Sequence, residues 1–223
     1  MSKPRSNTHH TGHNQDGLAN KLSESINRAM TEGRLLSLDA SKETDFAALV
    51  VERAAQPRAP AWMANAQTKD PSARAQVRAS YERCLEIYRT VVRPQDTAFD
   101  DAGGAVAFFV AVNLNALHDV HTTTETLLLL ERQLLGLVRD SSVWGAASIS
   151  ERQFYFEQMA MLGVLVAGTV AKARAEGPAA VAKTRETARK YLLRVLGMDP
   201  DLLTFGEHGL AMQTAPAEPP SAA

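Results

Sequence analysis

Apolar residues near the N-terminus follow a helical spacing. Every fourth residue of one short stretch is apolar, and this stripe consists of Leu18, Leu22, Ile26 and Met30. A repeat of this kind places the apolar side chains on one face of an amphipathic helix. A second short helix is predicted after residues 41–45, from the apolar residues Phe46, Leu49 and Val50.

Five longer apolar patterns predict the helices of one core domain. They cover residues 70–92, 100–117, 122–138, 148–175 and 178–196. Two of these helices carry small residues at every fourth position, which favours close packing of helix backbones at the centre of a bundle. No stretch combines alternating polarity with turn residues, so no strand is predicted. The fold class expected from the sequence is therefore all-α, a bundle of about five core helices.

Polar residues with capping chemistry mark the starts of several predicted helices. Asp70 precedes a proline and is a suitable N-cap. Ser148 and Glu151 have the spacing of a capping box, and so do Thr122 and Glu125. These capping residues indicate where the helices begin, and the connections between the helices are therefore predicted to be short.

The composition of the chain predicts its division into segments. We expect disordered tails at 1–17 and 213–223, because both are polar or rich in proline and small residues. The predicted parts between them are N-terminal amphipathic helices at 18–55, a Pro/Ala linker at 56–70 and the helical core domain at 71–212.

The charge balance and the cysteine content narrow the class of protein. Lys and Arg number 24 and Asp and Glu 25, so the net charge of −1 argues against a nucleic-acid partner. The single cysteine, Cys84, excludes an intrachain disulfide. The longest uncharged apolar run, Met159–Ala171, is shorter than the roughly 20 residues of a membrane span. With no apolar signal segment near the N-terminus, we expect a soluble, cytoplasmic protein.

Three polar residues in or beside apolar helices are candidates for a ligand pocket. Asn113 lies on an apolar face, Asp101 opens one helix, and Glu157 precedes the apolar run of the long helix. Two carboxylates brought together could also act as an acid/base pair. The alternative is structural: a hydrogen-bonded core amide, a helix cap and a surface charge.

Other candidate chemistry is weaker. His118 and His121 are metal-ligand residue types, but they are three residues apart in a predicted loop instead of four apart on a helix face. The alternative is that they are ordinary polar loop residues. Cys84 lies on an apolar stripe and is expected to be an unreactive core residue. No nucleotide-binding or catalytic motif is present, so we expect no cofactor and assign no catalytic residue.

The chain resembles a bacterial family known as domain of unknown function 6683 from Tyr81 to about Leu203. The resemblance rests on the segment FDDAGGAVAFFVAVNLNAL, the Thr-capped helix after it, Gln153 with Glu157, and the segment YLLRVLGMDPDLLTF. It implies an all-helical domain, often secreted, with no established activity. This chain departs from that pattern by showing no signal peptide.

Two functions stay open at this point. The first is a non-enzymatic accessory, immunity or regulatory protein that binds another protein or a second copy of itself. Its contact would be the stripe of Leu18, Leu22, Ile26 and Met30, which could equally dock on its own domain. The alternative is a small-molecule-binding or hydrolytic domain whose pocket contains Asp101, Asn113 and Glu157.

Overall fold

The computed structural model describes residues 15–33, 49–93, 99–139 and 142–213. The elements, in chain order, are α1 (Gln15–Thr31), β1 (Val50–Glu52), α2 (Ala59–Gln67), α3 (Pro71–Ile87), the π-helical turn η2 (Tyr88–Val92), β2 (Phe99–Asp101), α4 (Ala102–His118), α5 (Thr124–Arg139), α6 (Ser142–Ala146), α7 (Ile149–Glu176), α8 (Pro178–Leu196), the 3-10 turn η3 (Pro200–Leu202), β3 (Leu203–Gly206) and β4 (Gly209–Met212). The fold is mostly helical, which confirms the predicted all-α bundle.

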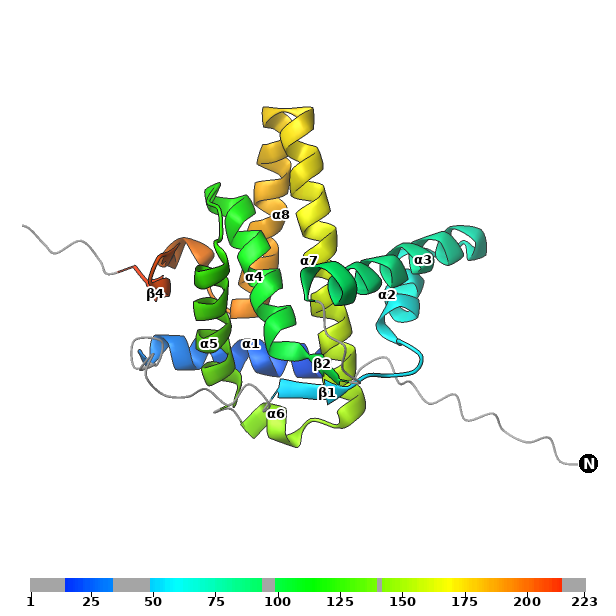
Figure 1. Ribbon diagram of the computed structural model, residues 1–223, viewed down its shortest axis with the longest axis horizontal. Helices are drawn as coiled ribbons and strands as arrows, with labels where there is room; N and C mark the ends of the chain where they lie inside the picture. Colours follow the sequence, from blue (N-terminus) through cyan, green and yellow to red (C-terminus); the bar gives the residue numbers. More distant parts are fainter. Residues whose placement is uncertain (1–14, 34–48, 94–98, 140–141, 214–223) are drawn as a thin grey trace, which may run out of the picture.

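Helix α4 is the centre of the bundle. Thirteen of its 17 residues are buried, and it packs against α5, α7 and α8. Figure 1 shows these helices side by side, with α1 crossing their lower ends and α2 and α3 projecting to one side. A Cβ atom at Gly163 of α7 would lie 2.6 Å from the ring of Phe108 on α4. On α7 the small residues at every fourth position are Gly163, Ala167 and Ala171. The close approach confirms tight packing at Gly163, whereas Ala171 is exposed.

Helix α7 is long and apolar enough to cross a membrane if length and composition alone are considered. However, 56% of its most apolar window is buried inside the protein. The central helix of a helical bundle has the same properties, so this feature does not by itself indicate a membrane span.

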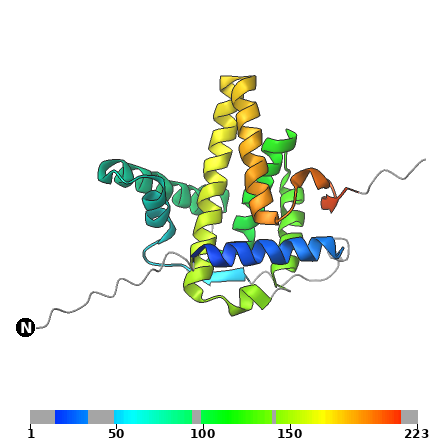
Figure 2. The same cartoon turned by 180° about the vertical axis from the view of Figure 1, so that it is seen from behind.

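The stripe on α1 packs into the protein's own core. Leu18, Leu22, Ile26 and Met30 are all buried, and α1 contacts α5, α6, α7 and α8 (Figure 2). The structure therefore differs from the predicted segment boundaries, because α1 belongs to the same core as the helices after residue 70. It also begins at Gln15, inside the predicted tail 1–17; the rest of that tail and residues 214–223 lie outside the described residues.

The segment 56–70, predicted as a linker, contains helix α2. Pro60 is compatible with a helix because it occupies the first turn, where a backbone N–H has no helical partner. Ala59 and Ala64 are buried, which fixes this helix on the core. Most of the predicted helix after residues 41–45 lies outside the described residues, and its last residue, Val50, begins strand β1.

Within the described residues, four short strands form two antiparallel pairs that the sequence did not predict. Strand β1 pairs with β2, with Val51 opposite Asp100, and β3 pairs with β4 in a hairpin. Each strand has only three or four residues, too few for an alternating pattern to be recognised. The β1–β2 pair matters for function because it carries two buried aspartates into the core.

The predicted caps are mostly confirmed. Asp70 accepts hydrogen bonds from two backbone amides of α3, and Ser148 and Glu151 form the expected capping box of α7. The box at Thr122 was wrong by one residue. Thr123 accepts the hydrogen bond from the backbone amide of Thr126, while the Thr122 hydroxyl bonds to a side chain of α4.

Candidate ligand-binding site

A π-helical turn at the end of α3 aims two arginines into the protein. The backbone N–H of Arg93 donates to the carbonyl of Tyr88, five residues earlier, at 2.8 Å. Such widened turns are rare and occur frequently at functional sites. Arg89 and Arg93, four residues apart, both reach the buried aspartates of β2.

Asp100 is the centre of one half of the resulting charge network. Its side chain is buried, and its Oδ1 accepts from Nε of Arg53 at 3.2 Å and from Nε of Arg89 at 3.0 Å. Its Oδ2 accepts from Nη2 of Arg89 at 2.6 Å and from Nε2 of Gln153 at 3.0 Å. Four donors from three parts of the chain thus compensate for the burial of one carboxylate.

Arg93 forms the other half with Glu131 and Asp101. Its Nη1 and Nη2 lie 2.6 and 2.8 Å from the two carboxylate oxygens of Glu131, and Nη2 also lies 3.0 Å from Asp101. Asp101 additionally caps α4 by accepting from the backbone of Gly104. Burial raises the pKa of Glu131, and the hydrogen bonds and charge of Arg93 oppose this shift.

Glu157, which lies on the neighbouring helix α7, caps the start of α2. Its Oε2 accepts from the backbone amides of Arg58 and Ala59, both at 2.9 Å, and its Oε1 accepts from Gln153 at 3.3 Å. Arg58 provides no side-chain cap for α2, so the carboxylate of Glu157 takes that role. Burial nevertheless raises the pKa of Glu157 above its ordinary value, against the effect of these hydrogen bonds.

A pocket of about 460 Å³ opens beside this network, between α7 and the segment that joins β1 to α2. We call it the polar pocket, and its lining residues are Glu52, Arg53, Ala54, Arg58, Ile149, Ser150, Gln153, Phe154 and Glu157. Its volume falls within the range of small-molecule sites. Two guanidinium groups and two carboxylates line a space large enough for a ligand.

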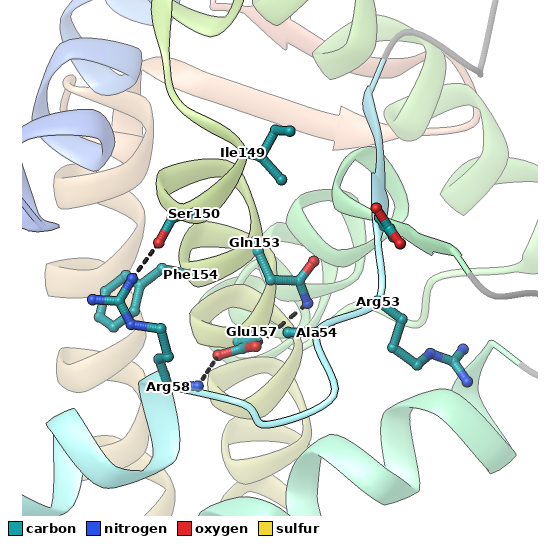
Figure 3. A pocket seen from close by; sticks show the side chains of 9 residues that line it. Arg53, Ala54, Arg58, Ile149, Ser150, Gln153, Phe154 and Glu157 are labelled. Atoms are coloured by element: carbon teal, nitrogen blue, oxygen red, sulfur yellow. Dashed lines mark hydrogen bonds between the residues drawn. The ribbon is translucent and has the colours of Figure 1, made fainter.

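Gln153 is the polar residue of the pocket whose hydrogen bonding is incomplete. Its Nε2 donates to Asp100 and Glu157, and Figure 3 shows its oxygen directed away from Glu157. That oxygen is buried and has no hydrogen-bond partner among the described residues. On the pocket wall, Arg58 donates from its guanidinium to the hydroxyl of Ser150, a neutral partner.

Comparison with known proteins identifies the family. A family described as one of unknown function, DUF6683, matches residues 5–213. The chain belongs to the DUF6683 family. No curated protein and no solved structure matches it significantly. The family match confirms the resemblance seen in the sequence and extends it toward the N-terminus, so that it includes α1, β1 and α2.

The DUF6683 fold does not bring the three predicted pocket residues together. Glu157 lines the polar pocket, but Asp101 is paired with Arg93 at the start of α4. Asn113 is buried and donates to the carbonyl of Phe109 on its own helix. Since Asp101 and Asn113 lie twelve residues apart on one helix, they are separated by about 18 Å along its axis. One small pocket cannot contain both.

The remaining candidates lie outside the network. His118 and His121 are exposed, and the described residues contain no group of three or more potential ligand side chains that could hold a metal ion. Cys84 is partly buried, and burial raises the pKa of its thiol. A raised pKa lowers the thiolate fraction, which agrees with the prediction of an unreactive cysteine.

Several residues of the DUF6683 network were missed by the sequence reasoning. One of them had a recognisable signal: Glu131 follows Leu127 by four residues and precedes Leu134 by three, so it lies on the apolar face of its helix. An acidic residue at such a position needs a buried partner. The residues that could not have been assigned from spacing alone are the arginines Arg53, Arg58, Arg89 and Arg93.

Proposed function

We propose that this DUF6683 chain is a non-enzymatic binding domain whose polar pocket holds a small organic acid that also carries a hydroxyl or amino group. The observation that carries the proposal is the buried, unpartnered oxygen of Gln153. A desolvated acceptor without a partner costs about 1–3 kcal/mol. A donor on the ligand would remove that cost, which favours a ligand with an N–H or O–H group.

The charged groups of the pocket support the acidic part of this ligand. Arg58 is exposed, and no ion pair joins it to a carboxylate among the described residues. Arg53 uses its Nε on Asp100, which leaves its outer N–H groups for another acceptor. Guanidinium groups bind carboxylates through paired, charge-assisted hydrogen bonds. The exposed carboxylate of Glu52 suits the amino or hydroxyl group of the same ligand.

Binding is favoured over hydrolysis because the two buried carboxylates beside the pocket already accept several hydrogen bonds. Both oxygens of Asp100 and both oxygens of Glu157 are engaged. The hydroxyl of Ser150 is bonded to a guanidinium, and no histidine lines the pocket to activate it. A general base or nucleophile needs a free lone pair at the reacting atom.

The partner-binding function predicted for the α1 stripe loses its physical basis in this fold. All four stripe residues are buried against the protein's own helices. Presenting them to another protein would require α1 to leave the core. Of the contacts that the sequence left open for this helix, the structure has the one with its own domain, so we do not propose the stripe as a partner contact.

The test is isothermal titration calorimetry with two matched pairs of acids. Malate differs from succinate, and glutamate from glutarate, by the presence of a hydroxyl or amino group. We expect the donor-bearing member of a pair to bind at least about tenfold more tightly, since a hydrogen bond to a charged or desolvated group contributes roughly 1.5–3 kcal/mol.

Variants then locate the binding. Arg58→Ala should weaken acid binding at least about tenfold, whereas Arg83→Ala, an exposed arginine of α3 outside the pocket, should leave it unchanged. Absence of binding for all four acids, or equal effects of the two variants, would contradict the proposed function.

A further inference from the structure

A second pocket lies on the opposite face of α7. It has a volume of about 320 Å³ and is enclosed by α1, α2, α4, α7 and α8. We call it the aromatic pocket, and its lining residues are Ala19, Trp62, Met63, Phe109, Tyr155, Gln158, Met159, Leu162, Tyr191, Arg194 and Val195. On α7 the aromatic pocket is lined by residues 155, 158, 159 and 162, whereas the polar pocket is lined by residues 149, 150, 153, 154 and 157. With 3.6 residues per turn, the two sets point in opposite directions.

Four aromatic rings from four different helices form the walls. Phe109 and Tyr191 meet edge to face, with ring centroids 5.6 Å apart. Trp62 is held edge to face against Phe154 at 5.4 Å. Contacts between rings fix their orientations before any ligand enters. Burial raises the pKa of Tyr155, so its hydroxyl stays neutral at physiological pH.

One polar side chain of the aromatic pocket has no partner. Gln158 is only 9% exposed. No hydrogen bond joins its amide to any other group in the part of the chain that the structure describes. A carboxamide has two N–H donors and an oxygen acceptor. An amide on the pocket wall that forms no hydrogen bond to the protein is available to a ligand group.

We propose that the aromatic pocket binds a two-ring aromatic molecule with one N–H or O–H group, the rings against the aromatic walls and the donor on the oxygen of Gln158. The size follows from the volume, since a cavity of about 150 Å³ holds benzene and this pocket has about twice that volume, 320 Å³. One hydrogen-bonding group is assigned to the ligand because one amide of the pocket lining lacks a hydrogen bond to the described residues, and an N–H or O–H group fits its oxygen. This ligand class and this site are independent of the acid bound in the polar pocket.

The experiment uses indole and 1-methylindole, which differ only in the N–H group. The full chain is labelled with ¹³C at its methionine methyl groups, and two of its seven methionines, Met63 and Met159, line the pocket. An aromatic ligand shifts the resonances of methyl groups beside its ring. Indole should shift the signals of Met63 and Met159 and not that of Met198, with the signals assigned through Met→Leu variants. Indole should bind at least fivefold more tightly than 1-methylindole.

Two variants and one control distinguish the site from general apolar binding. Ala19→Phe places a ring in the pocket and should abolish the shifts, whereas Ala75→Phe, on the exposed side of α3, should not. Gln158→Leu keeps the volume but removes the amide, so it should reduce the preference for indole to less than twofold while 1-methylindole still binds.

Three results would overturn the proposal. They are the absence of shifts at Met63 and Met159 with either compound, shifts that persist in Ala19→Phe, and a preference for indole that Gln158→Leu leaves unchanged. If Ala19→Phe does not fold, the Gln158→Leu comparison decides alone. Malate should shift neither methionine, so failure of the polar-pocket proposal and failure of this one give different results.

Discussion

Replacing Arg93 with methionine should strongly destabilise the protein. Methionine keeps most of the apolar stem of the side chain but removes the guanidinium that lies 2.6 and 2.8 Å from the oxygens of Glu131. The carboxylate of Glu131 is fully buried and would lose its charged partner. Breaking a buried ion pair from one side costs about 3–5 kcal/mol. That is a large part of the roughly 5–15 kcal/mol by which a domain is stable.

The loss should depend on pH in a defined direction. Burial raises the pKa of Glu131 in the folded protein, and Arg93 opposes this shift. Without Arg93 the folded-state pKa is raised further above the value of the unfolded chain. The folded protein then binds more protons than the unfolded protein between these two pKa values, so the free energy of unfolding falls as pH rises through that interval. Arg93→Met should therefore cost more at pH 7.5 than at pH 5.

Urea denaturation followed by circular dichroism at both pH values measures this effect. Arg83→Met, at an exposed position of α3, is the control and should change the free energy of unfolding by less than about 0.5 kcal/mol. The double variant Arg93→Met/Glu131→Leu should regain most of the lost stability, because the fully buried carboxylate of Glu131 is removed and Asp101 keeps its hydrogen bond from the backbone of Gly104. The reasoning is refuted if Arg93→Met costs less than about 1 kcal/mol, or if its cost is the same at both pH values.

Two further substitutions test how the network is packed. Gly104→Ala should destabilise by about 1–3 kcal/mol in thermal unfolding, because a Cβ atom there would lie 2.7 Å from the carboxylate of Asp101. Gly168→Ala is the control, because nothing lies within 4 Å of a Cβ atom there, and it should stabilise the helix by about 0.5–1 kcal/mol. If Gly168→Ala also destabilised the protein, the effect of Gly104→Ala could not be assigned to the contact with Asp101. Glu157→Gln should cost about 1–3 kcal/mol in urea denaturation, since a neutral amide accepts less strongly from the start of α2. Glu86→Gln, on an exposed position, should be neutral, and equal effects of the two changes would argue against the capping role of Glu157.

The candidate site was predictable only in part. The sequence drew attention to Asp101 and Glu157, because acidic residues beside apolar helices are unusual. It could not assign their partners. Arg93 is 38 residues from Glu131, and Arg58 is 99 residues from Glu157. Contacts over such separations depend on where helices lie in space, and a single sequence carries no direct signal of that.

The sequence by itself determined the elements whose causes are local. Helical periodicity, the caps at Asp70 and Ser148 and the left-handed Gly197 after α8 act within a few residues, so they could be recognised without the fold. Tertiary structure decided what depends on distant contacts. It pairs β1 with β2 across about fifty residues, buries the α1 stripe in the chain's own core, and turns three arginines toward buried carboxylates. An apolar face or a charge needs a partner, and only the packing of the whole chain determines which partner it meets.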